Sequence, residues 1–165
     1  MRRSLLGLLT VALLATGCTS PTVEHTDHAM AAEVVFQEQW ASAGDGEMAA
    51  VFGTLVNNGH HEARVVSGSS PAAGRVEVHE VAGDAGAKTM RPKEGGIVLP
   101  AGGSHELVPG GDHLMLMDLT APLAVGSDIE LTVQFEDGST LPVTVQVRDF
   151  AGANEEYQPK HDGHG

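Results

Sequence analysis

The sequence predicts one all-β domain, either an antiparallel β-sandwich or a small Greek-key β-barrel. Apolar residues alternate with polar ones at period two in many short runs, Gly and Pro clusters separate these runs, and no stretch has a convincing helical period. Short strands at this spacing are typical of sandwiches and Greek-key barrels. Because only 4% of the residues are aromatic, we expect a core built mainly of Val, Leu and Ala.

The last two predicted strands form the clearest local unit. Leu131, Val133 and Phe135 alternate with polar residues up to the turn at Asp137 and Gly138, and the alternation then resumes. This pattern predicts a hairpin with one buried face. The predicted strands are 34–40, 48–57, 63–68, 75–81, 96–100, 105–109, 113–119, 128–136 and 140–150.

The N-terminus has the layout of a secretory signal. Two arginines precede an apolar run from Leu5 to Leu14, which is too short to span a bilayer, and small residues then lead to Cys18. The stretch LLATGC resembles a bacterial lipobox, although Leu14 lies one residue further from the cysteine than is usual. We expect residues 1–17 to be a lipoprotein signal peptide and a lipid on Cys18 to anchor the protein to the cell membrane, outside the cytoplasm. The alternative is a secreted protein with an incidental cysteine.

The composition restricts the partners. The formal net charge is −13, and removal of residues 1–17 makes it more negative because two arginines are lost. An acidic surface repels nucleic acid and attracts cations, so we expect no nucleic-acid binding. Residues 18–31 and 151–165 are polar and aperiodic, which predicts a lipidated flexible tether and a disordered tail on either side of a folded domain at 32–150.

One face of the predicted strand 113–119 gathers an imidazole and thioethers. The leucines of this strand are the better core candidates, so His113, Met115 and Met117 should point outward or toward a loop. In the predicted strand 75–81, His79 falls on the polar face by the same parity.

These side chains could form a site with two nitrogen and two sulfur ligands. His113 and Met115 rise from the same face of one strand, and Met90, in a Gly-rich charged loop, could fold back over His79 and His113. Thioether and imidazole ligands favour Cu(I). A blue-copper site needs a cysteine thiolate, and the single cysteine is at the N-terminus, so such a site would hold and transfer the ion. The competing interpretation is ordinary packing or solvated surface.

The order of these residues is His79, ten residues, Met90, twenty-two residues, His113, one residue, Met115. This spacing resembles the signature of the PCuAC (DUF461) family of periplasmic copper chaperones. The resemblance implies a cupredoxin-like Greek-key β-barrel with an exposed Cu(I) site formed by these four residues. It also implies delivery of Cu(I) to the dinuclear copper centre of cytochrome c oxidase, alongside Sco-type proteins. Similar segments are Trp40, 49–59, 76–80, 90–92, 99–103, 107–119 and 131–138.

Other histidines and methionines are less specific. The tether and tail could capture Cu(II), which imidazole and carboxylate ligands suit, or their histidines could simply be solvated. Met117 lies outside the signature and is interpreted as packing around the site, with coordination as the alternative. We expect His60, His61 and His105 to be surface residues. The candidate auxiliary ligands are His25, His28, Met30, His161 and His164.

The expected function is that of a monomeric extracytoplasmic copper chaperone. No nucleophile–base pair, paired-carboxylate motif or phosphate-binding loop has a persuasive context, and four protein ligands leave a metal no position for substrate, so we do not expect an enzyme. Two alternatives are a copper storage or detoxification lipoprotein and a β-sandwich surface module that binds no metal.

Overall fold

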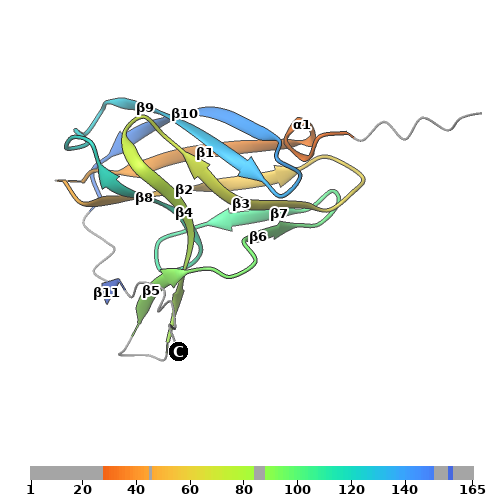
Figure 1. Ribbon diagram of the computed structural model, residues 1–165, viewed down its shortest axis with the longest axis horizontal. Coiled ribbons are helices and arrows are strands. Elements are labelled where there is room, and N and C mark those ends of the chain that lie inside the picture. Colours follow the sequence, from red (N-terminus) through yellow and green to blue (C-terminus); the bar gives the residue numbers. More distant parts are fainter. Residues whose placement is uncertain (1–27, 45, 84–87, 151–155, 158–165) are drawn as a thin grey trace, which may run out of the picture.

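The computed structural model describes residues 28–44, 46–83, 88–150 and 156–157, which form an almost entirely β structure with one short helix (Figure 1). The elements are α1 (Met30–Glu33), β1 (Val34–Ser42), β2 (Met48–Asn57), β3 (Ala63–Ser69), β4 (Ala73–Ala82), β5 (Thr89–Pro92), β6 (Ile97–Leu99), β7 (Ser104–Leu107), β8 (His113–Leu119), β9 (Asp128–Phe135), β10 (Thr140–Arg148) and β11 (Glu156–Tyr157).

Seven strands close a barrel in the order β4-β8-β2-β1-β10-β9-β3, because β3 also pairs with β4. Strands β6 and β7 pair with β3 and β2, while β5 and β11 extend the sheet beyond β4 and lie below the barrel in Figure 1. The predicted all-β fold is therefore confirmed, and of the two expected forms, sandwich and barrel, the structure has the barrel. The expectation of purely antiparallel pairing is wrong for β1 and β10, which run parallel. These two strands come from opposite ends of the domain, so no hairpin needs to join them.

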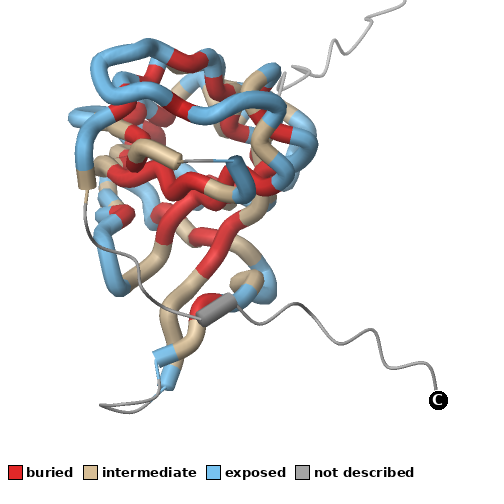
Figure 2. Tube along the Cα trace, turned by 90° about the vertical axis from the view of Figure 1, so that its left-hand side faces the viewer, coloured by how far each residue is buried: buried red, intermediate tan, exposed pale blue. Residues whose placement is uncertain are grey.

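The barrel interior is filled by aliphatic side chains and two phenylalanines, as the composition predicts. Figure 2 shows these buried segments within the barrel. The predicted hairpin is confirmed as β9 and β10: Leu131, Val133 and Phe135 are buried, and Gly138 adopts φ +81° in the turn. Each barrel strand contributes alternate residues to this core, as a pleated sheet requires.

A second, smaller cluster of buried side chains lies outside the barrel interior, around β2 and β8. Strand β8 is therefore buried on both faces from His113 to Met117. The His and Met face of this strand points away from the barrel interior, as expected, but it is not exposed to solvent, because β5 and aromatic side chains cover it. The cluster consists of Ala50, Phe52, Met90, Met115 and Met117, with Trp40, Met48 and Phe150 packed against it.

A β-bulge in β1 turns Trp40 toward this second cluster. The register with β2 shifts between Gln37 and Trp40, and Glu38 has φ +52°. Phe36 belongs to the main core and lies an even number of residues before Trp40, so a regular strand would place both on one face. The extra residue of the bulge reverses the parity, which is a common use of bulges.

Two segments expected to be flexible contain secondary structure. Met30 and Ala31, at the end of the predicted tether, belong to α1, and their backbone N–H groups donate to Asp137 Oδ2 (2.8 Å) and Ser139 Oγ (3.0 Å). In the predicted tail, residues 156–157 pair with β5. The predicted signal peptide, Cys18, His25, His161 and His164 lie outside the described residues. Within the described part of the chain, no helix has the length and hydrophobicity needed to cross a membrane.

Candidate metal centre

Two buried histidines face each other across β4 and β8. His79 and His113 are directly opposite in the antiparallel register, with ring centroids 5.8 Å apart and exposures of only 0% and 3%. As the sequence predicts, His79 lies on the opposite face of β4 from Val76 and Val78. That face is buried and not exposed to solvent at His79. Buried imidazoles need polar partners, and both rings have them.

The two ring nitrogens of His113 have different contacts. Nδ1 lies 3.0 Å from the carbonyl oxygen of Gly111, and Nε2 lies 3.1 Å from Met90 Sδ. A carbonyl only accepts, so Nδ1 carries the proton and donates it to Gly111. In the neutral ring, Nε2 then presents its lone pair to the thioether, which is itself a weak acceptor. A cation that accepts both lone pairs would make this arrangement favourable.

His79 is oriented by a carboxylate. Its Nε2–H donates to Glu77 Oε2 over 2.8 Å, so Nδ1, which is buried, is the nitrogen this ring can offer to a metal. Burial lowers the pKa of His79 more than the Glu77 carboxylate raises it, which keeps the imidazole neutral at pH 7.

Glu77 remains ionised in this position. Burial raises its pKa, but hydrogen bonds from His79 and Arg75 outweigh that effect and hold the pKa below its ordinary value. Arg75 Nε lies 2.8 Å from Glu77 Oε1, and Arg75 Nη1 lies 2.6 Å from Asp118 Oδ2. A fixed carboxylate behind a ligating histidine is a common device for orienting the ring.

Met90 lies on β5, not in a loop as its surroundings predicted. The strand pairs with β4 in a hairpin that sets Met90 opposite Val81 and Pro92 opposite His79. Its side chain is only 5% exposed and reaches His113. Gly-rich flanking sequence concealed this strand, because only four of its residues have strand geometry.

Met115 and Met117 are both buried in the second cluster. Met115 is opposite Glu77 in β4, next to the histidine pair, whereas Met117 is one side-chain repeat further along and opposite Arg75. The structure thus brings His79, Met90 and His113 together, with Met115 adjacent in the same cluster.

Aromatic side chains enclose the other flank of the centre. The Phe52 ring lies 5.9 Å from that of His113, Trp40 lies 4.8 Å from Phe52, and Phe150 lies 5.4 Å from Trp40 (centroid distances). Phe52 and Phe150 are not among the site residues that the sequence predicts. One feature of the sequence could have indicated Phe52: it lies in a continuous apolar run, and such a run is typical of a strand that is covered on both faces.

The donor set determines what the centre could bind. Among the residues that the structure describes, no group of three or more His, Cys, Asp or Glu side chains is placed to hold a metal ion. The cluster instead combines two imidazoles with thioethers, which are soft ligands and suit Cu(I) better than zinc, calcium or magnesium.

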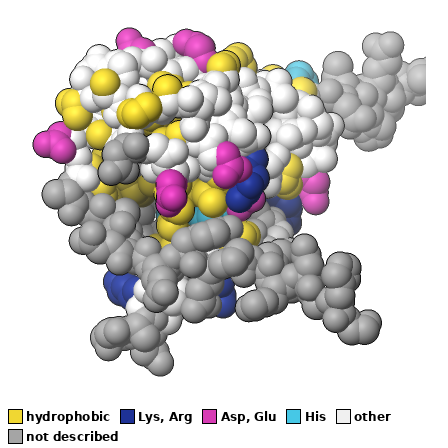
Figure 3. Space-filling model, turned by 60° about the vertical axis from the view of Figure 1, so that its left-hand side comes forward, with side chains coloured by type: hydrophobic (Ala, Val, Ile, Leu, Met, Phe, Trp, Pro, Cys, Tyr) yellow, Lys and Arg dark blue, Asp and Glu magenta, His cyan; other side chains and the backbone are white. Residues whose placement is uncertain are grey.

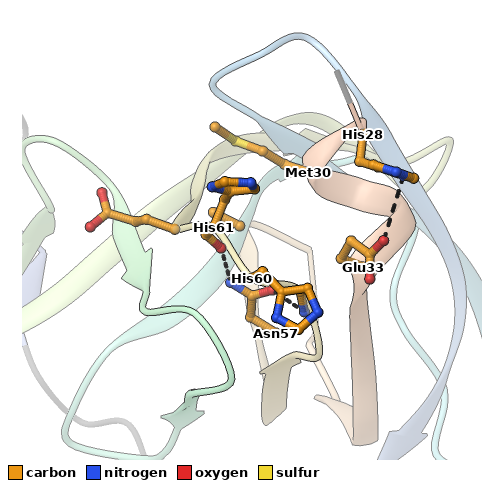
Figure 4. A pocket seen from close by; sticks show the side chains of 9 residues that line it. His28, Met30, Glu33, Asn57, His60 and His61 are labelled. Carbon is orange, nitrogen blue, oxygen red and sulfur yellow. Dashed lines mark hydrogen bonds and ion pairs between the residues drawn. The ribbon is translucent and has the colours of Figure 1, made fainter. Parts of the chain in front are cut away.

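Two of the candidate auxiliary metal ligands, His28 and Met30, lie in a separate pocket. His28 and Met30 line it together with His60 and His61, and Figure 4 shows these side chains around a common hollow. His28 Nδ1 lies 3.7 Å from Glu33 Oε1. His60 and His61 are exposed, as predicted. The part of His28 and Met30 in metal binding stays a prediction.

The barrel and its buried His/Met cluster define a cupredoxin-like domain of the PCuAC type. The copper-bound PCuAC domain from PmoF2 is 22% identical and superposes with a TM-score of 0.59, covering 72% of this chain and 94% of that domain. Apo-DR1885 from Deinococcus radiodurans, solved in solution, is 27% identical with a TM-score of 0.52 and covers 88% of this chain and 98% of its own. The expected resemblance and fold are confirmed.

The chain belongs to the LpqE-like family, described as "Putative lipoprotein LpqE-like", whose model matches residues 23–147. A relative from Leifsonia xyli subsp. xyli, "Putative lipoprotein Lxx21020", is 42% identical over 159 residues, which cover 93% of this chain and 96% of the relative. "Uncharacterized protein RP573" from Rickettsia prowazekii is 27% identical over 121 residues, or 70% of this chain and 67% of that protein.

Proposed function

We propose that this protein is an extracytoplasmic copper chaperone that binds Cu(I) through His79, Met90, His113 and Met115. The observation that carries the proposal is the 3.1 Å contact between His113 Nε2 and Met90 Sδ. With Nδ1–H donating to Gly111, the neutral imidazole turns the lone pair of Nε2 toward the thioether, so two lone-pair donors face each other at a buried position. A soft monovalent cation between them removes their repulsion and matches both ligand types.

The chemistry of the centre favours carriage over catalysis. Two imidazoles and two thioethers would saturate Cu(I) and leave no position for a substrate. The solution structure of CuI-DR1885, 26% identical with a TM-score of 0.51, supports copper as the cargo. The lipoprotein descriptions of the family and of the Leifsonia relative support a lipid anchor on Cys18.

The proposed acceptor is the dinuclear copper centre of cytochrome c oxidase, reached directly or through a Sco-type protein. This part follows from the resemblance of the His79 to Met115 spacing. A lipid anchor would keep the carrier at the membrane in which such an acceptor is embedded. We further propose that the carrier acts as a monomer.

Anaerobic Cu(I) titration with X-ray absorption tests the proposal. We expect one tightly bound Cu(I) per chain with nitrogen and sulfur neighbours in equal number. The His79→Ala/Met115→Ala variant should lose tight binding, whereas His60→Ala/His61→Ala, altered in the separate pocket, should retain it. Unchanged tight binding in the first variant would contradict the proposed ligands, and no tight binding in the wild type would contradict the function.

A further inference from the structure

A chain of charged side chains joins the three segments that carry the histidines and Met90. Glu80 follows His79 in β4, Lys93 follows the end of β5, and Asp112 precedes His113 at the start of β8. Lys93 Nζ lies 3.1 Å from Glu80 Oε2 and 3.3 Å from Asp112 Oδ1. The ammonium group therefore bridges two carboxylates that adjoin the two buried histidines.

Both carboxylates are also held from their other side. Arg91 Nη2 lies 2.9 Å from Glu80 Oε1, and His105 Nε2 lies 2.9 Å from Asp112 Oδ2. The side chains of Lys93, Glu80 and Asp112 are 27%, 26% and 15% exposed, so solvent screens this network less than it screens an isolated surface pair. On one face of the molecule, Figure 3 shows acidic and basic side chains lying next to each other.

Because the proposed ligands are buried, an ion-pair bridge that holds their cover in place can affect the movement of copper. His79, Met90, His113 and Met115 are between 0% and 5% exposed, so copper can enter or leave only if part of the cover moves. Strand β5 lies outside the closed barrel and pairs with β4 on one edge and with β11 on the other. It is therefore a covering element that can move without opening the barrel.

We propose that Lys93 latches β5 in place, holding Met90 over the histidine pair, and thereby sets the rate at which copper enters and leaves. The Lys93–Asp112 contact is the decisive one, because it ties the β4–β5 hairpin to the turn that precedes β8. Lys93 is a positioning residue and not a metal ligand. The inference rests on the proposed Cu(I) function.

Copper-transfer kinetics of the full chain test the latch. In Lys93→Met, we expect removal of Cu(I) by bathocuproine disulfonate to be about tenfold faster, as loss of two partly buried ion pairs would allow. Loading should accelerate as well, so the Kd should change less than either rate. Lys93→Arg should restore slow removal, and Lys88→Met, an exposed lysine just before β5, should leave both rates unchanged. Equal rates in Lys93→Met and wild type, or a loss of affinity without faster loading, would overturn the latch.

A measurement without copper separates the latch from the proposed function. Amide hydrogen exchange of the apo protein should be faster at residues 89–91 in Lys93→Met, with β9 and β10 unchanged. High salt should accelerate exchange at 89–91 in the wild type, since it screens the same ion pairs. This second measurement needs no variant, so it tests the latch even if Lys93→Met fails to fold. Unchanged exchange at 89–91 under both conditions would overturn the latch whether or not the protein binds copper.

Discussion

At the residue scale, Met115 and Met117 show how register distinguishes two chemically identical side chains. Both lie on the same face of β8 and both are buried among the same apolar neighbours. Met115 is opposite Glu77, the carboxylate that orients His79, whereas Met117 is opposite Arg75. Alternation along the strand predicts the shared face, but only the pairing with β4 shows which thioether adjoins the histidines.

Replacement of each methionine by leucine should separate ligation from packing. Leucine nearly conserves volume, so either substitution should cost less than about 1.5 kcal/mol of stability. Met115→Leu should lower Cu(I) affinity at least tenfold because a soft donor is lost, and Met117→Leu should leave affinity nearly unchanged. Competition titrations against a Cu(I) chelator measure both. Equal losses in the two variants would refute the distinction.

At the element scale, Gly53 in β2 makes room for the bulge in β1. Gly53 has φ +141°, and a Cβ there would lie 2.8 Å from the Gln37 carbonyl oxygen and 2.8 Å from Phe36 Cε2. The absent side chain lets the bulged backbone of β1 approach its neighbour β2 closely at this point. The bulge in turn places Trp40 against Phe52 beside the histidines.

Gly53→Ala should therefore destabilise the fold through both backbone strain and a steric clash. We expect a loss of about 1–3 kcal/mol in the free energy of unfolding from strain of this kind, with the clash adding to it. Gly126→Ala is the matched control, because Gly126 also has positive φ (+85°) but a Cβ at this position would meet nothing within 4 Å. Urea unfolding of both variants measures the difference. If Gly126→Ala lowered the free energy of unfolding as much as Gly53→Ala, the close approach of β1 to Gly53 would contribute nothing to the effect.

At the scale of the whole molecule, the barrel separates two cores with different roles. The interior is mainly aliphatic and closed by seven strands, while the second cluster combines methionines with aromatic rings under β5, beside the two buried histidines. In the proposed latch mechanism, the barrel remains folded while β5 moves. The net charge of −13 adds a long-range attraction for a cation.

Cu(I) should accordingly raise the thermal stability of the whole domain. A ligand that binds only the folded state stabilises it by about 2.7 kcal/mol at a hundredfold excess over its Kd, which corresponds to a rise of several degrees in Tm. Anaerobic calorimetry with and without Cu(I) measures the shift, and the His79→Ala/Met115→Ala variant should show none. A comparable shift with Zn²⁺ would indicate that thioether softness does not select the metal.

The amino-acid sequence by itself determined the all-β class, most strand positions and the shared faces of the site residues, while the alternation left both a sandwich and a barrel open. Strands such as β2 and β8 were predicted with their observed bounds, because period-two alternation is a local property of the chain. The short strand β5 was missed, since Gly-rich neighbours and four residues carry too little local signal.

Burial of the centre was decided only by the tertiary structure. Whether His79 and His113 face solvent depends on what covers them, and the covering groups come from β5 and from the distant Phe52. The same holds for the tautomer of His113, which Gly111 sets, and for the bridge made by Lys93. Alternation assigns a side chain to a face of a sheet, whereas long-range packing determines what that face meets.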